Sequence, residues 1–208
     1  MDLNTWIAFF IASCLISVSP GPGAISCMSA GMRYGWGRAV WNIVGLITGL
    51  AVIVAVIGAG VGALLIASST AFTVLKWIGA AYLVYLGIQQ WRAPVQAMSA
   101  AGEHEAATPR ELYMRGLFVN LTNPKGIAFL LAVLPQFIDP GKPLFVQYAI
   151  CAVTLSLTDF AIMNVYTVIA SRMLRWLRNE THIRWMNRIF GGLFVGAGAV
   201  LVTFKRTV

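Results

Sequence analysis

The chain has 208 residues, of which 59% are hydrophobic and 11% are charged. A soluble domain is about 45–50% apolar and about 25% charged, so the composition excludes a water-soluble globular protein. The formal net charge of +8 does not indicate nucleic-acid binding, because the basic residues stand at the ends of apolar runs and are not interleaved with aromatics on one face. We expect an all-α, polytopic protein of the lipid bilayer.

Six apolar segments are long enough to cross a bilayer, at about 20 residues per crossing. They are predicted at 5–28, 39–66, 71–91, 115–138, 144–171 and 184–204. A polar connecting loop at 92–113 divides a single transmembrane domain, 1–208, into half one (1–91) and half two (114–208). Because each half has an odd number of spans, the halves are expected to be inverted repeats that run in opposite directions, as in many transporters.

The basic residues favour one side of the membrane. The connections after the first, third and fifth spans carry ten arginines, whereas the opposite side carries four basic residues. The positive-inside rule makes the side with ten arginines cytoplasmic and places both termini outside. Lys205 and Arg206 count against this orientation.

The first span of each half contains residues that interrupt a helix. These residues are Ser19, Pro20, Gly21, Pro22 and Gly23 in half one, and Asn120, Asn123, Pro124 and Lys125 in half two. Paired interruptions at corresponding positions are typical of a transport site. Two packing kinks without a function are the alternative.

Polar residues of four spans are expected at similar depths. At about 1.5 Å rise per residue across about 30 Å of hydrocarbon, Pro20 and Asp159 lie about 22 Å below the outer edge. By the same measure Pro124 lies about 13 Å and Asn42 about 5 Å from the cytoplasmic edge. We predict the substrate site in this layer, on the cytoplasmic side of the midplane.

Asp159 is the only carboxylate within a predicted span. Ionised carboxylates cost several kcal/mol in hydrocarbon and usually mark an ion or substrate pathway. We expect Asp159 to couple transport to protons or to bind the ammonium of a substrate. A structural partnership, for example an ion pair with Lys125, is the alternative.

Lys125 and three asparagines complete the predicted site. A helix that restarts after Pro124 exposes free N–H groups at its positive end, and these groups and Lys125 suit a carboxylate. Lys125 can instead extend to the cytoplasmic headgroups. Asn42, Asn120 and Asn123 either contact the substrate or hold helices together.

Catalysis has little support in the sequence. No predicted span contains a histidine or a second carboxylate, and no metal or nucleotide-binding motif is present. We therefore expect neither an enzyme nor a cofactor, and the remaining energy source is an ion gradient. The GxxxG spacings Gly45/Gly49, Gly58/Gly62 and Gly192/Gly196 indicate close helix packing or a homodimer.

Several long motifs resemble the LysE/RhtB family of amino-acid exporters. They are SPGPGAI (19–25), LKWIGAAYLVYLGIQQWRA (75–93), FVNLTNPKGIAFL (118–130), PQFI (135–138) and VTLSLTD (153–159). The resemblance implies a six-span exporter of small amino acids in the bacterial inner membrane, driven by exchange with protons. It also implies that the interrupted helices and Asp159 form the site.

The second and fourth predicted spans contain no acidic residue, unlike family members that export basic amino acids. We therefore expect proton-coupled export of small neutral amino acids (homoserine, homoserine lactone or threonine) by alternating access between the two halves. A lactone has no free carboxylate, so capture of a carboxylate is not obligatory. The alternatives are export of leucine, cysteine or a basic amino acid, and a passive channel or accessory membrane protein.

Overall fold

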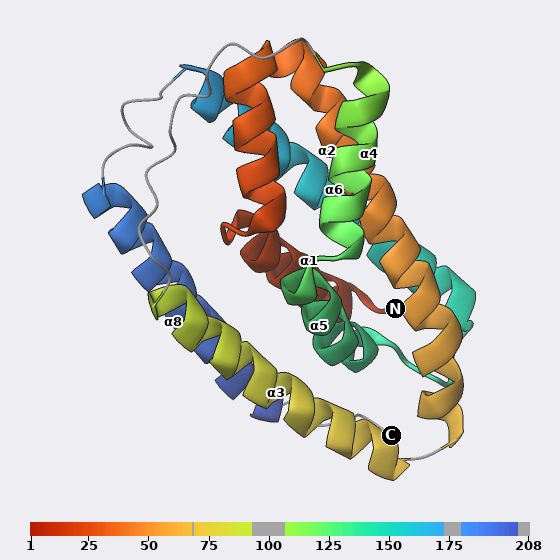
Figure 1. Ribbon diagram of the computed structural model, residues 1–208. Helices are drawn as coiled ribbons and strands as arrows, with labels where there is room; N and C mark the ends of the chain where they lie inside the picture. The colour runs from red at the N-terminus through yellow and green to blue at the C-terminus, as the bar shows by residue number, and fades with distance from the viewer. Residues whose placement is uncertain (68, 93–106, 173–179, 204–208) are drawn as a thin grey trace.

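The computed structural model describes residues 1–67, 69–92, 107–172 and 180–203, and within these ranges every regular element is a helix (Figure 1). Most of the predicted polar loop lies outside the described residues. The elements are α1 (Leu3–Val18), α2 (Pro22–Ala67), α3 (Ser69–Arg92), α4 (Pro109–Leu121), α5 (Pro124–Val133), the 3-10 helix η1 (Leu134–Phe137), α6 (Leu144–Arg172) and α8 (Glu180–Thr203).

Several of these helices are suited to a bilayer. The segment Pro22–Gly60 of α2 and most of α6 are each long and apolar enough to cross a membrane. The consecutive helices α4 and α5–η1 meet the same test together, as one span bent by 51°. Helix α1 is apolar but shorter, because it is the first part of an interrupted span. The prediction of an all-α polytopic membrane protein is confirmed.

Helix α2 consists of two segments that meet at Gly35. This glycine has φ 72° and ψ 168°, a conformation that costs glycine little and other residues much. We call residues 22–34 α2a and residues 36–67 α2b. The first predicted span therefore consists of α1 and α2a, and its last segment continues to residue 34 instead of ending at 28.

Helix α4 begins earlier than the sequence analysis predicted. Its N-cap is Thr108, whose hydroxyl accepts a hydrogen bond from the N–H of Glu111 at 3.2 Å. The Glu111 carboxylate in turn accepts from the N–H of Thr108 at 2.7 Å. This capping box, with Pro109 as the first helical residue, pairs backbone N–H groups that a helix start leaves open. The polar loop predicted to end at 113 therefore ends at 108.

Glycines bring helices of the two halves into backbone contact. A Cβ atom at Gly45 of α2b would collide with the backbone of Tyr113 in α4, and one at Gly116 of α4 would collide with the backbone of Asn42 in α2b. Likewise, a Cβ at Gly31 of α2a would meet the carbonyl oxygen of Thr167 in α6 at 2.7 Å. The close packing indicated by Gly45 is thus present, and it occurs within one chain.

Helices α3 and α8 form a second closely packed pair, which lies along one side of the molecule (Figure 1). A Cβ at Gly87 of α3 would meet the carbonyl oxygen of Gly191 in α8 at 2.6 Å. Near the other end of the pair, a Cβ at Gly198 would meet the carbonyl oxygen of Ala80 at 3.0 Å. This pair also joins one helix of half one to one helix of half two.

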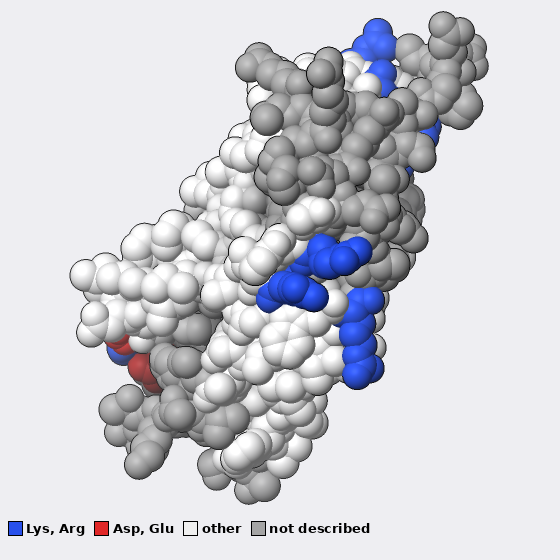
Figure 2. Space-filling view, turned by 90° about the vertical axis from the view of Figure 1, so that its left-hand side faces the viewer, with Lys and Arg blue, Asp and Glu red and all other residues white. Residues whose placement is uncertain are grey.

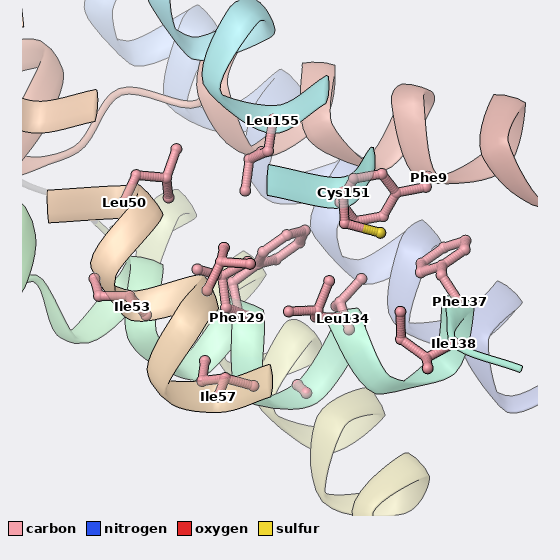
Figure 3. Packing of buried hydrophobic residues seen from close by; sticks show 14 of the residues in the cluster. Phe9, Leu50, Ile53, Ile57, Phe129, Leu134, Phe137, Ile138, Cys151 and Leu155 are labelled. Atoms are coloured by element: carbon pink, nitrogen blue, oxygen red, sulfur yellow. The ribbon is translucent and has the colours of Figure 1, made fainter. Parts of the chain in front are cut away.

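An apolar cluster fills the space between α1, α2b, α5–η1 and α6 (Figure 3). Phe9 and Phe137 meet edge to face, with ring centroids 5.3 Å apart, and Leu134 and Cys151 have no exposed surface. Lipid is as apolar as these side chains, so close dispersion contacts and not exclusion of water hold the cluster together. The cluster supports the interrupted helices from one side.

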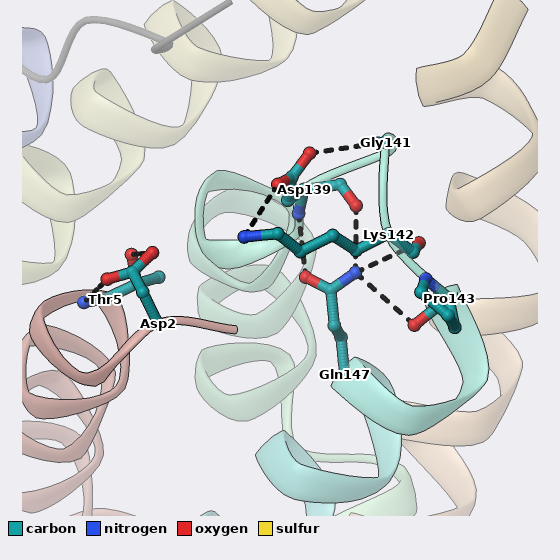
Figure 4. A network of polar contacts seen from close by, with 7 residues as sticks. All are labelled: Asp2, Thr5, Asp139, Gly141, Lys142, Pro143 and Gln147. Atoms are coloured by element: carbon teal, nitrogen blue, oxygen red, sulfur yellow. Dashed lines mark hydrogen bonds and ion pairs between the residues drawn. The ribbon is translucent and has the colours of Figure 1, made fainter.

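The turn before α6 is fixed by one buried glutamine (Figure 4). The side chain of Gln147 accepts from the N–H of Asp139 at 2.9 Å and donates to the Asp139 carbonyl at 2.8 Å. Asp139 also accepts from the N–H of Gly141 and forms a 3.3 Å ion pair with Lys142. The hydrogen bond from the Gly141 N–H has the largest effect on the Asp139 carboxyl, followed by the Lys142 ammonium. Together they hold the pKa of this carboxyl below its ordinary value.

Charged residues separate along the bundle. Arg33, Arg38 and Arg110 lie where α2a, α2b and α4 meet, and we call this the basic end. Asp2 and Asp139 lie at the opposite end, where Lys142 acts electrostatically on both. In Figure 2 most of the blue atoms of described residues lie at the upper right and right of centre, whereas the red atoms lie at the lower left with one small blue patch beside them.

Candidate functional site

The first interruption separates α1 from α2a. Ser19 follows α1 in an extended conformation, with φ −72° and ψ 118°. Helix α2a then begins at Pro22, whose missing N–H is no loss in the first turn of a helix. The last carbonyls of α1 have no helical partner. One of them, that of Val18, accepts a 2.5 Å hydrogen bond from the Tyr166 hydroxyl of α6.

The second interruption separates α4 from α5. Asn123 is the N-cap of α5, and its side chain accepts a 3.1 Å hydrogen bond from the N–H of Lys125. The carbonyl of Pro124 accepts a 3.2 Å bond from the Tyr82 hydroxyl of α3. Each interruption is therefore held by a tyrosine of a neighbouring helix.

The side chain of Lys125 joins the two interruptions. Its ammonium donates to the hydroxyl and carbonyl oxygens of Ser19, at 2.6 and 3.2 Å, and to the carbonyl oxygen of Pro20, at 3.3 Å. The same nitrogen lies 5.0 Å from the ring centroid of Phe194 in α8, within the range of a cation–π contact. Lys125 therefore points toward half one and does not extend to the membrane surface.

Both interruptions line one small cavity of about 60 Å³, which is enough for several water molecules. Gly21, Gly23 and Ala24 line it from the start of α2a, and Asn123, Lys125 and Gly126 line it from the start of α5. Two helix N-termini with positive dipole ends therefore meet at one cavity. The other lining residues are Ile16, Ser17, Ser19, Leu46, Leu50, Asn120, Phe129, Leu130, Leu155, Asp159 and Met163.

Asp159 lines the cavity from α6. Ser17, a buried residue in the last turn of α1, lines the same cavity. Asp159 and Lys125 are both described, and they do not form an ion pair within 4.0 Å. The ion pair between them that we considered from sequence is therefore absent, and each group faces the cavity separately.

The cavity offers complementary groups to a zwitterion. The N–H groups at the starts of α2a and α5 suit a carboxylate. The oxygens of Ser19, at the negative end of α1, and the carboxyl of Asp159 suit an ammonium. Opposite charges of a small solute can therefore find opposite partners within one cavity.

The structure brings together seven residues that the sequence analysis selected. Ser19, Gly21, Gly23, Asn120, Asn123, Lys125 and Asp159 all line the cavity. Pro20, Pro22 and Pro124 belong to the interruptions but not to the lining, and they shape the backbone instead.

Asn42 lies outside the cavity lining. It is fully buried, and its amide donates to the carbonyl of Leu112 in α4 at 3.1 Å. Its oxygen accepts from the hydroxyl of Ser26 at 3.1 Å. Asn120 has a similar bond, because its amide donates to the Leu46 carbonyl at 2.7 Å, but Asn120 also lines the cavity. The geometry gives Asn42 the role of linking helices.

Four residues of the site were not selected from the sequence: Ser17, Tyr82, Tyr166 and Phe194. Ser13 and Ser17 are one helical turn apart in an otherwise apolar stretch, and this spacing was a signal for a polar face directed inward. Tyr82 and Phe194 lie in apolar stretches of α3 and α8, whereas Tyr166 lies two helical turns after Asp159 in α6. Nothing in those stretches distinguished residues that face the site from residues that face lipid.

Comparisons with known proteins agree with this geometry. Residues 14–204 match the LysE type translocator family. The chain is 42% identical over 205 residues to the homoserine/homoserine lactone efflux protein of Salmonella typhimurium, covering 99% of each chain. It is 40% identical over 207 residues to an uncharacterized membrane protein of Vibrio cholerae, covering 99% of this chain and all of the other. No solved structure matches.

The matched regions, residues 14–204 for the family and 99% of the chain for the two relatives, cover the positions of both interruptions and of Asp159. Members of the matched family are translocators and not enzymes. The chain belongs to the LysE type translocator family.

Proposed function

We propose that this protein exports small neutral amino acids, with homoserine, homoserine lactone and threonine as the first candidates, in exchange for protons. The observation that carries the proposal is the cavity at which the N-termini of α2a and α5, the oxygens at the end of α1 and one carboxylate meet. The printed function of the Salmonella relative, homoserine and homoserine lactone efflux, supports the choice of substrate.

Each group of the cavity has a distinct role in this proposal. The N–H groups near Gly23 and Gly126 receive the carboxylate of the amino acid. A lactone lacks this carboxylate, but its ring carbonyl accepts hydrogen bonds from the same groups. Asn120 and Asn123 supply amide groups beside them. The uncharged lining residues, such as Leu46, Leu130 and Met163, leave room for the short side chain of a small amino acid. They offer no counter-charge to the side chain of a basic amino acid.

Asp159 carries the proton in this proposal. An isolated carboxylate at a cavity within the bilayer is stable when protonated or when facing a cation or water. It therefore releases its proton on one side of the membrane and regains it on the other as access to the cavity alternates. The protein needs no cofactor for this cycle, because the proton gradient supplies the energy.

We assign the basic end of the bundle to the cytoplasm, following the positive-inside rule. Arg33, Arg38 and Arg110 then face the cytoplasm, and Asp2 and Asp139 face the periplasm of a bacterial inner membrane. The amino acid enters from the basic end and leaves at the opposite end. Both termini lie on the periplasmic side.

The test is efflux of labelled homoserine and threonine from proteoliposomes, with and without an acidic external medium. We expect protons that enter to accelerate homoserine efflux more than threonine efflux. Asp159→Asn is expected to reduce gradient-driven efflux to the level of protein-free liposomes. The matched control is Asp139→Asn, which removes a carboxylate of the turn outside the cavity and is expected to leave efflux unchanged.

Two results would refute parts of the proposal. Gradient-driven efflux at the wild-type rate in Asp159→Asn would remove Asp159 from proton coupling. Efflux of both amino acids that ignores the pH difference would indicate a passive channel.

A further inference from the structure

The end of α1 presents a set of oxygen atoms to the interior of the protein. Carbonyl groups at the C-terminus of a helix lack helical partners and carry the negative end of the dipole. The Val18 carbonyl is occupied by the Tyr166 hydroxyl. The next two carbonyls, those of Ser19 and Pro20, and the Ser19 hydroxyl all accept from a single ammonium nitrogen.

These three oxygens and one aromatic ring form an ammonium cage. The oxygens lie 2.6–3.3 Å from Nζ of Lys125, and the ring centroid of Phe194 lies 5.0 Å away. Phe194 is 3% exposed, so its ring is buried. Oxygen dipoles together with an aromatic ring are a recognised way to bind an organic ammonium. Unwound backbone carbonyls at helix ends bind cations in other transporters.

The cage belongs to half one and α8, whereas the ammonium that fills it comes from half two. Lys125 is the second residue of α5, and its side chain crosses from the second interruption to the first. Its aliphatic stem passes Gly21, where a Cβ atom would lie 3.4 Å from Cδ of the lysine. Any group that displaces this ammonium therefore releases the contact between the two interruptions.

The cage opens on the cavity of the proposed substrate site. Ser19 and Lys125 both line that cavity. A zwitterion that places its carboxylate at the N-termini of α2a and α5 must direct its ammonium elsewhere. The Ser19 oxygens lie at the negative end of α1, opposite in sign to those N-termini.

We propose that the cage is an ammonium site that Lys125 and the substrate occupy in turn. Lys125 fills it when the cavity is empty. The α-ammonium of the amino acid displaces Lys125, whose own ammonium then turns to the substrate carboxylate. This exchange rests on the proposed export function, because it requires an amino acid in the cavity, and it couples substrate binding to separation of the two interruptions.

The test uses purified Lys125→Ala protein in detergent, which leaves the cage empty. Methylammonium chloride is expected to raise its melting temperature saturably, by about 2–4 °C. The wild-type protein is expected to show no such rise, since its cage is filled. Tetramethylammonium chloride, which has no N–H to donate, controls for ionic strength. Ser19→Ala added to Lys125→Ala removes one oxygen and is expected to weaken the response.

Lys125→Ser provides a second variant with a small side chain if Lys125→Ala does not remain monodisperse. An equal rise in wild type and variant, or no rise in a variant that elutes as folded protein, would overturn the cage. Homoserine efflux by wild-type proteoliposomes is measured in parallel. If the wild-type protein exports homoserine but the variant does not respond to methylammonium, the ammonium cage is refuted and the proposed function stands. If the variant responds but no amino acid is exported, both the exchange with substrate and the proposed function are refuted.

Discussion

Two interfaces of this protein differ sharply in how closely their helices approach. Where α2b meets α4, Gly45 and Gly116 place the two backbones in direct contact. Where α8 faces α1 and α5, an apolar cavity of about 460 Å³ remains, and Gly192 and Gly196 of α8 have no atom within 4 Å of a Cβ position. One interface is closed by glycines, whereas at the other the glycines face open space.

The close contacts divide the helices into two groups. Helix α2 contacts both α4 and α6 extensively, and α3 and α8 contact each other. Both groups combine helices of half one with helices of half two. If the proposed export proceeds by alternating access, we expect these two groups to be its rigid units.

The largest expected effect comes from filling the closed interface. Gly116→Ala places a methyl group against the backbone of Asn42, so α4 and α2b must move apart. Overpacking of this kind costs about 1–3 kcal/mol. Thermal unfolding in detergent measures the loss, with Gly192→Ala as the matched control.

Gly192→Ala is expected to be neutral or slightly stabilising, because its new methyl group meets no atom within 4 Å and alanine favours the helix. Equal losses in the two variants would contradict the difference between the interfaces.

A smaller loss is expected from Asn42→Ala in the closed interface. The change removes the hydrogen bonds to the Leu112 carbonyl and from the Ser26 hydroxyl. Hydrogen bonds between membrane helices contribute about 0.6 kcal/mol on average and up to about 1.7 kcal/mol. We therefore expect a lower melting temperature and an unchanged KM for homoserine efflux.

The control for that variant is Asn4→Ala, which removes the amide of an exposed asparagine near the start of α1 and is expected to change neither quantity. A raised KM for Asn42→Ala at normal stability would return Asn42 to the substrate site.

The sequence predicted the interruptions because proline breaks the interior of a helix and because glycine and asparagine are poor helix formers. The rise per residue then gave the depths of Pro20, Pro124 and Asp159, and the structure does bring the two interruptions and Asp159 to one cavity. Depth alone does not say which face of a helix a residue occupies. By depth alone Asn42 belongs to the site, whereas in the structure its amide donates to the Leu112 carbonyl of α4.

Other features were hidden because polarity was the main guide to helix ends. The sequence Thr108-Pro109-Arg110-Glu111 has the pattern of a capping box, yet its polar residues made it resemble part of the loop. Tyr82, which holds the second interruption, lies in a stretch that is apolar all around, whereas Tyr166, which holds the first, lies between Asn164 and Thr167 in α6. Only the tertiary arrangement shows which of their faces is directed inward.

The smallest change in stability is expected when the open interface is filled. Gly196→Leu extends a side chain from α8 into the apolar cavity between α1, α5 and α8. We expect the free energy of unfolding to rise by at most about 1 kcal/mol, because leucine is a better helix former than glycine and displaces only lipid or empty space. Export is expected to slow if α3 and α8 approach α1 during transport.

Gly60→Leu separates the two effects. Gly60 of α2b also has no atom within 4 Å of its Cβ position, but it does not line the cavity. It is expected to show a similar change in melting temperature and normal homoserine efflux. If both variants export at the wild-type rate, the cavity keeps its volume through the cycle and the α3–α8 pair does not close on α1. If only Gly196→Leu is slow, the space beside α8 is part of the movement that opens the site.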